Sequence, residues 1–174
     1  MKILLLYASH GGATRTCAEL LAEHLNLHHS VTVLPEWQTL PAPTEFDAVI
    51  IGSPIRIGNM NKSLKHYIRQ HREELSNMPF AVFFCCGYPR QFEEYVETQL
   101  PKGLVCSLGT HCFGGKLKPE KLKGLDKWIV KAARSSIHSQ DFEESDTDHH
   151  DLPEIIPENI KLLANEIKKL SKNG

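Results

Sequence analysis

The sequence lacks the features that would place it in a membrane or nucleic-acid-binding class. No apolar run is long enough to cross a membrane, and the first one, about six residues, is too short for a signal-peptide core. Charge is balanced, with 20 basic and 21 acidic residues and a net charge of −1. A dedicated nucleic-acid-binding protein would carry a basic surplus. We therefore expect a cytoplasmic protein that binds no nucleic acid and has no transmembrane segment.

The sequence also has no recognisable metal or nucleophile motif. Its five cysteines are an odd number without a C-x-x-C pair, which favours reduced, mostly buried thiols. Cys85 and Cys86 are consecutive in an apolar stretch, so their side chains should face opposite sides of a sheet. The histidines show no zinc-site spacing, and no Gly-x-Ser-x-Gly elbow occurs. We predict no metal, and catalytic residues stay unassigned.

Apolar runs alternate with helical patterns along the chain. The 174 residues, 41% of them hydrophobic, suit a single domain over 1–174, with a mobile acidic surface loop at 139–151. Apolar stretches predict strands at 3–8, 31–34, 47–52, 80–87 and 109–115. Helical spacing predicts helices at 17–25, 64–75, 91–100, around 128–132, and from 157 onward. Continuously apolar strands alternating with helices predict an α/β fold whose parallel sheet is covered on both faces.

The first strand ends in a short loop suited to an anion. Glycines tolerate positive φ, and a loop at a helix N-terminus offers free backbone amides. Neither the lysine of a Walker loop nor the G-x-G-x-x-G fingerprint is present, which favours a monophosphate such as that of FMN. The plainer interpretation is a strand-to-helix turn capped by Thr14. The candidate phosphate-binding residues are Ser9, His10, Gly11, Gly12, Ala13 and Thr14.

A second loop, residues 52–61, has the character of a surface for a flat aromatic ligand. Pro54 and Gly58 favour an irregular backbone, and Ile55 and Ile57 offer apolar surface. Arg56 places a cation where a reduced ring would become anionic. The alternative is an ordinary connection whose isoleucines face the core.

These loops make the chain similar to flavodoxin-fold proteins, and particularly to the branch containing menaquinone-dependent protoporphyrinogen dehydrogenase. The resemblance spans roughly residues 1–135 and rests on 9–14, on the Ile-Gly-Ser-Pro-Ile-Arg-Ile-Gly string at 51–58, and on Met78-Pro79. It implies a three-layer sandwich with strand order 2-1-3-4-5 and an FMN cofactor. That branch carries a long basic insertion after the strand that ends near Gly87, whereas this chain has a short acidic stretch at 91–95.

The resemblance also implies which residues contact FMN. The phosphate would lie on residues 9–14, and two later loops would flank the ring, with Tyr88 as the candidate for stacking. With Arg56 and Arg90 nearby, a less negative potential than in acidic flavodoxins is expected. A backbone flip at Gly58 is expected to bring a hydrogen bond to the reduced flavin N5. The implied ring-side residues are Ser53, Pro54, Ile55, Arg56, Ile57, Gly58, Asn59, Cys86, Gly87, Tyr88, Pro89 and Arg90.

The implied function is that of an FMN-dependent oxidoreductase or electron-transfer protein. Its acceptor or donor would be a quinone, a porphyrinogen or a similar molecule. Two alternatives stay open: a one-electron shuttle between redox proteins, and a non-enzymatic flavin-binding interaction module. Expected partners are accordingly a redox protein or a small hydrophobic molecule, with peripheral membrane contact and a homodimer also compatible with the sequence.

Overall fold

Five parallel strands form the central sheet in the computed structural model, which describes residues 1–115 and 154–170. The spatial order is β2-β1-β3-β4-β5, so the second strand lies outside the first and the chain then crosses to the other side. In register, Leu5 of β1 lies between Val33 of β2 and Ile50 of β3. The strands are β1 (Lys2–Tyr7), β2 (Ser30–Pro35), β3 (Ala48–Pro54), β4 (Phe80–Cys85) and β5 (Thr110–Cys112).

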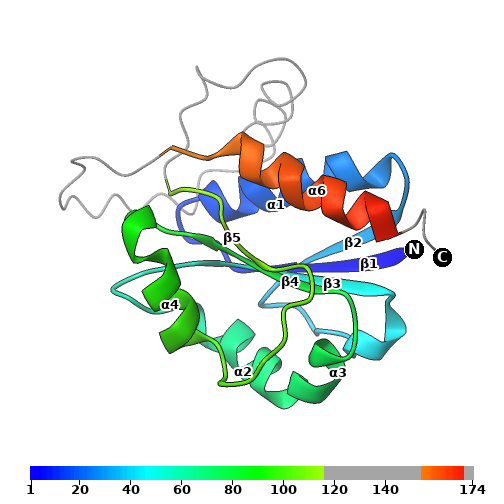
Figure 1. The fold of residues 1–174 in the computed structure, drawn as a ribbon, viewed down its shortest axis with the longest axis horizontal. Helices are drawn as coiled ribbons and strands as arrows, with labels where there is room; N and C mark the ends of the chain where they lie inside the picture. Colours follow the sequence, from blue (N-terminus) through cyan, green and yellow to red (C-terminus); the bar gives the residue numbers. More distant parts are fainter. Residues whose placement is uncertain (116–153, 171–174) are drawn as a thin grey trace.

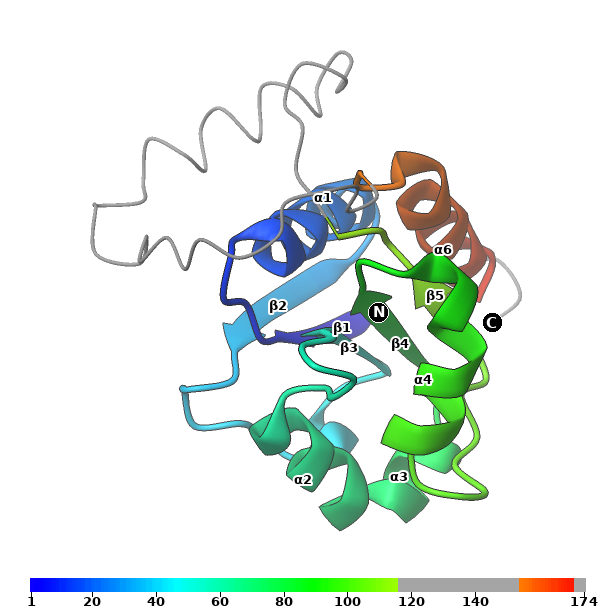
Figure 2. The ribbon, with the colours of Figure 1, turned by 90° about the vertical axis from the view of Figure 1, so that its left-hand side faces the viewer.

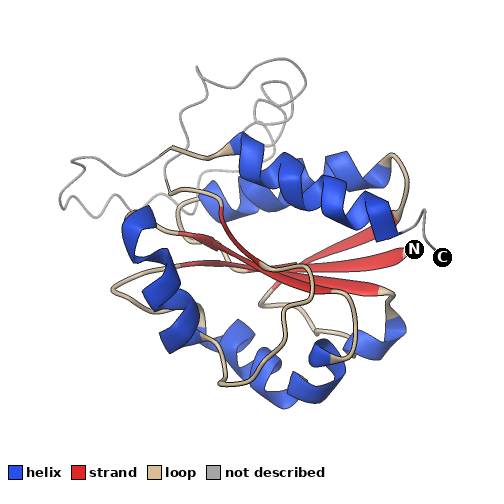
Figure 3. Cartoon of the chain, in the orientation of Figure 1, coloured by secondary structure: helices blue, strands red, loops and turns tan. Residues whose placement is uncertain are grey.

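Helices cover both faces of the sheet (Figures 1 and 3). On one face lie α1 (Ala13–Asn26) and α6 (Pro157–Leu170), which pack against each other. On the other face lie α2 (Lys62–Gln70), α3 (Arg72–Ser76) and α4 (Phe92–Gln99). Two short 3₁₀ helices, Pro43–Glu45 and Pro89–Gln91, complete the connections.

Strands β1 to β4 each contribute to two cores because successive side chains point to opposite faces. In β1, Ile3 and Leu5 pack in the core under α1 and α6, while Leu4 and Leu6 pack in the core under α2, α3 and α4. All four side chains are fully buried. Burial on both faces is the reason that the strand sequences are continuously apolar rather than alternating.

The strand order and layers predicted from sequence are confirmed, with local differences. The strand predicted over 109–115 covers only Thr110–Cys112. β3 runs to Pro54 because the chain continues to pair with β4 as far as Cys85. The helix predicted over 64–75 is divided into α2 and α3, because His71 adopts φ −107° and ψ 26°, outside the helical region. The predicted helix around 128–132 and the acidic loop at 139–151 lie outside the described residues.

The loops that follow β1, β3 and β4 meet at one edge of the sheet (Figure 2). Backbone hydrogen bonds join them there: the Ala8 amide donates to the Gly52 carbonyl at 3.0 Å, and the Ile55 amide donates to the Cys85 carbonyl at 2.9 Å. The carboxyl edge of a doubly wound sheet is the usual position for a ligand. Among the helices that the structure describes, none has the length and apolar character needed to cross a membrane.

Candidate functional site

The loop after β1 is shaped by one glycine and two hydroxyl groups. Gly12 precedes α1 in the left-handed conformation, with φ 82°, so the chain turns directly into the helix. The Ser9 hydroxyl accepts a hydrogen bond from the Arg15 amide at 3.3 Å, and Thr16 donates its hydroxyl to the Gly12 carbonyl at 3.1 Å. The plainer alternative, a turn capped by Thr14, is therefore wrong: Gly12 holds the capping position, and Thr14 is a buried residue of the first turn.

The backbone amides of this loop are open to a ligand. Within the described part of the chain, the amides of residues 10–14 have no hydrogen-bond partner. A Cβ built on Gly11 or Gly12 meets no atom within 4 Å, so the space beside these two glycines is open. Unpaired amides at the positive end of a 14-residue helix suit a phosphate group.

The loop after β3 forms a tight hairpin at residues 56–59. Arg56 and Asn59 exchange two backbone hydrogen bonds of 2.9 Å each. The two tip residues both have positive φ, 48° at Ile57 and 72° at Gly58, as a type I′ turn requires. Glycine accepts this conformation easily, but a β-branched residue there is strained. Ile57 is also 100% exposed, so burial of its side chain does not offset the strain. Such strain is typical of a functional loop.

Two side-chain amides hold the carbonyl groups of this tip. Asn59 Nδ2 donates to the Ile57 carbonyl at 2.8 Å, and Gln99 Nε2 donates to the Gly58 carbonyl at 2.8 Å. Gln99 comes from the end of α4 and is itself buried. Its Oε1 accepts from the Met60 amide at 3.3 Å, so one side chain clamps the loop from both sides. A backbone flip at Gly58 would have to break the hydrogen bond to Gln99.

Of the remaining ring-side residues in this loop, Ser53 points inward. Its side chain is fully buried, and its hydroxyl accepts from the Asn61 amide at 2.9 Å and donates to the Pro54 carbonyl at 3.0 Å. The Ser53 hydroxyl thus fixes the loop instead of facing a ligand. Ile55 is partly buried against the core beneath, whereas Arg56 is exposed.

The loop after β4 presents one large aromatic side chain to solvent. Tyr88 is 65% exposed, and the 3₁₀ helix that begins at Pro89 also exposes Arg90. Cys86 differs from its neighbours in this loop: its side chain is 1% exposed, and its sulfur lies 3.5 Å from that of Cys112. Exposed apolar side chains at this edge therefore include Tyr88, Ile57 at the hairpin tip, and Trp37 just after β2.

Glu36, at the end of β2, is an acidic group that the sequence analysis did not select. Its Oε1 accepts from Asn61 Nδ2 at 3.3 Å, while its Oε2 is buried and has no partner in the described structure. Burial raises the pKa of the Glu36 carboxyl above its usual range, and the charge of His10 in the first loop partly opposes this. Its position directly after a strand was the available sequence signal. Glu36 places a carboxylate next to the candidate phosphate loop.

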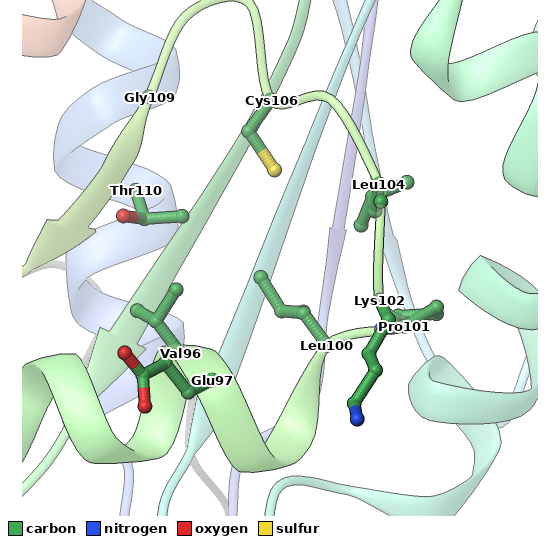
Figure 4. Close-up of a pocket in the computed structure, with 10 residues that line it drawn as sticks. Val96, Glu97, Leu100, Pro101, Lys102, Leu104, Cys106, Gly109 and Thr110 are labelled. Carbon is green, nitrogen blue, oxygen red and sulfur yellow. The ribbon is translucent and has the colours of Figure 1, made fainter.

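A separate hollow of about 540 Å³ lies between α4 and the chain leading into β5 (Figure 4). Its lining includes Val96, Leu100, Leu104, Cys106 and Thr110. Because α4 runs away from the carboxyl edge, the end of this helix and the start of β5 lie toward the opposite edge of the sheet. This hollow is distinct from the three loops described above.

The protein has a doubly wound sheet with an open amide loop, an anchored hairpin and an exposed tyrosine at its carboxyl edge, the usual ligand position in this class of fold. The chain belongs to the flavodoxin family: a family profile described as a flavodoxin domain matches residues 4–145. The family membership implies FMN as the cofactor. The open amides of residues 10–14 fit its phosphate, and the exposed side chains of Ile57 and Tyr88 fit its ring.

Two curated relatives and two solved structures illustrate the similarity. Protoporphyrinogen IX dehydrogenase [quinone] of Escherichia coli K12 is 29% identical over 93 residues, 48% of this chain and 47% of the relative. The protein of the same name from Leishmania major is 30% identical over 86 residues, 47% of this chain and 37% of the relative. The matched regions thus span half or less of these curated relatives.

The structural neighbours show the fold. A short-chain flavodoxin associated with a non-canonical PDU bacterial microcompartment has a TM-score of 0.57 at 14% identity, covering 99% of this chain and 98% of the neighbour. The Streptococcus pneumoniae TIGR4 flavodoxin has a TM-score of 0.53 at 16% identity, with 100% of both chains covered.

Proposed function

We propose that this flavodoxin-family protein passes electrons between FMN and a quinone, a porphyrinogen or a similar planar hydrophobic molecule. The observation that carries the proposal is Ile57, a fully exposed, β-branched residue at φ 48° on the tip of an anchored hairpin. Holding an isoleucine in this conformation lowers the stability of the free protein, and this strain supports a role for Ile57 in contacting a flat apolar ligand. The similarity to protoporphyrinogen IX dehydrogenases supports the choice of acceptor.

In this proposal, each of the three loops contacts a different part of the cofactor. The amides of residues 10–14 bind the phosphate, aided by the dipole of α1. The hairpin tip covers one side of the ring, Tyr88 covers the other, and Gln99 keeps the tip in place through the Gly58 carbonyl. When bound, FMN supplies the electron-transfer chemistry. Arg56 and Arg90 contribute positive charge near a ring that gains negative charge on reduction.

A charge placed in the phosphate loop tests the cofactor site. Gly11 has no atom within 4 Å of a built Cβ and no positive φ, so Gly11→Asp fits sterically. Its carboxylate would repel the FMN phosphate, and Gly11→Asn is the matched neutral control. In titrations followed by flavin fluorescence, Gly11→Asp should weaken FMN binding about tenfold or more, equal to roughly 1.4 kcal/mol. Riboflavin, which lacks the phosphate, should bind both variants alike; an equal loss for the two flavins would contradict the phosphate position.

The acceptor is tested with the FMN-loaded chain. Protoporphyrinogen oxidation in the presence of menadione, followed by porphyrin fluorescence, should proceed faster than with free FMN at the same concentration. Tyr88→Ala should slow this reaction, because an aromatic side chain at the open edge would be lost. This substrate class would be excluded if the FMN-loaded chain neither reduced menadione nor oxidised protoporphyrinogen faster than free FMN does.

The alternative, a one-electron shuttle, is favoured by a different observation. Glu93, Glu94 and Glu97 lie exposed on α4, directly after the loop that contains Tyr88. An acidic surface beside the cofactor can steer a basic protein partner. Electron transfer from a ferredoxin reductase that falls steeply with ionic strength, and that is slowed by Glu93→Gln with Glu94→Gln, would favour the shuttle over the quinone or porphyrinogen reaction.

A further inference from the structure

Four of the five cysteines form two pairs at the end of β4. Cys85 and Cys86 are consecutive and face opposite sides of the sheet, as the sequence predicts. Cys85 meets Cys17 of α1, with the sulfur atoms 3.7 Å apart. Cys86 meets Cys112 of β5, with the sulfur atoms 3.5 Å apart. These contacts join residues 68 and 26 positions apart, so only the fold brings the thiols together.

The two pairs lie in different environments. Cys17 and Cys85 are buried in the core under α1, where burial raises the pKa of the Cys17 thiol well above its usual range. Cys112 lies on β5, the edge strand of the sheet, and is only partly buried. A hydrogen bond with Cys86 lowers the pKa of the Cys112 thiol, and a second one from the Gly114 amide adds to the effect, against burial. Cys112 is therefore the more acidic and the more accessible thiol of the two, compared with Cys17.

The geometry also allows a bond between Cys86 and Cys112. Phe84 is the register partner of Cys112, so Cys86, two residues further on, is its diagonal neighbour on the same face. A disulfide needs about 2.05 Å between the sulfur atoms, so they must approach by about 1.5 Å. β5 has only three residues and pairs on one side, with β4. Bond formation therefore requires a shift of this short edge strand, which is also held by the hydrogen bond from Asn159 Nδ2 to the Cys112 carbonyl at 2.7 Å.

We propose that Cys86 and Cys112 are a redox-active dithiol, a covalent modification site that exchanges with a low-molecular-weight disulfide such as oxidised glutathione. Cys112 is the nucleophile: its thiolate attacks one glutathione sulfur, forms a mixed disulfide and releases one glutathione thiolate. Cys86 is the resolving group: its sulfur attacks the Cys112 sulfur, the sulfur–sulfur bond to glutathione breaks, and the Cys86 proton passes to the departing thiolate, which leaves as the second glutathione. The two protein thiols lose two electrons, and one oxidised glutathione is reduced to two glutathione molecules.

The modification would act on the loop that carries Tyr88. Cys86 directly precedes residues 87–90, and the Tyr88 amide hydrogen-bonds its sulfur. A bond to β5 would tie the start of this loop to the sheet edge. The proposal concerns thiol chemistry of the protein itself and does not depend on bound FMN.

The test is a redox titration of the full chain without added flavin. The protein is equilibrated with reduced and oxidised glutathione at a series of ratios, the free thiols are alkylated, and peptide mapping identifies the protected cysteines. We expect two of the five alkylation sites to be lost together, with Cys86 and Cys112 joined in one cross-linked peptide. In the reduced protein, Cys112 should be alkylated before Cys106, because burial raises the pKa of Cys106 to about 11.

Single variants separate the two pairs. Cys112→Ser and Cys86→Ala should abolish the cross-link, whereas Cys17→Ser and Cys106→Ser should keep it. Circular dichroism verifies that each variant is folded. If a variant does not fold, peptide mapping of the wild-type chain still shows whether Cys86 and Cys112 are joined. The proposal is overturned if all five thiols stay free at every ratio, if Cys17 and Cys85 are joined instead, or if Cys112 stops at the mixed disulfide with glutathione.

Discussion

Replacing Ile57 with asparagine should stabilise the free protein and weaken its binding to FMN. Ile57 is 100% exposed and has φ 48°, so its side chain contributes no burial but is held in the left-handed region. For a non-glycine residue that region costs roughly 1–2 kcal/mol, and asparagine tolerates it far better. The hydrogen bonds of the hairpin are made by the backbone and should persist.

We therefore expect Ile57→Asn to gain about 1 kcal/mol of unfolding free energy in the chain without FMN, or about 2–4 °C in Tm for a protein of this size. With saturating FMN, this gain in unfolding free energy should be cancelled or slightly reversed, because the variant loses apolar contact with the ring. Burying part of an isoleucine side chain is worth about 1–1.5 kcal/mol, which corresponds to roughly tenfold weaker binding.

Urea unfolding of the FMN-free chain and fluorescence titration with FMN measure the two effects separately. Leu27→Asn is a matched control, because Leu27 is 73% exposed but has an ordinary φ of −63°. That variant should change neither quantity appreciably. A loss of stability in Ile57→Asn would refute the strain argument. Unchanged FMN affinity would refute the contact with the ring.

Three further substitutions probe the sheet edge. Gly52→Ala places a Cβ 2.0 Å from the ring of Phe83, so it should destabilise the fold by about 3 kcal/mol, measured by urea unfolding; a loss below about 1 kcal/mol would contradict the close packing. Gln99→Leu removes the donor to the Gly58 carbonyl and should lower the free energy of unfolding by about 1–3 kcal/mol. It should also speed tryptic cleavage at the neighbouring hairpin. Unchanged cleavage would mean that Gln99 does not hold the loop. Glu36→Gln should stabilise the chain at pH 7.5 but not at pH 4. Burial raises the pKa of Glu36 above its usual 4.5, so the wild type loses stability as the pH rises through the pKa of the folded state. The variant does not lose this stability, because the glutamine side chain does not ionise. Equal urea midpoints of wild type and Glu36→Gln at both pH values would contradict this sign.

Much of the site could be predicted because its signals are local. The turn into α1 requires glycine at position 12, where φ is 82°, and the sequence shows Gly11-Gly12 after an apolar strand. The hairpin tip likewise shows Gly58 beside Ile57. The orientation of Ser53 could not be predicted, because a hydroxyl group at a strand end can face either a ligand or the loop. The Asn61 amide, 2.9 Å from the Ser53 hydroxyl, decides the matter in favour of the loop.

By itself, the sequence determined the parallel sheet, its strand order through family resemblance, and the loops at its carboxyl edge. Runs such as 48–51 and 80–84 are apolar throughout because helices cover both faces of the sheet. Every residue in these runs is buried, so the sequence itself reveals this environment. Only the tertiary structure decided which distant side chains meet. Gln99 lies 41 positions from Gly58, and Cys112 lies 26 from Cys86, yet each pair is in contact. Such contacts follow from how helices and strands pack in space, which no local pattern of residues encodes.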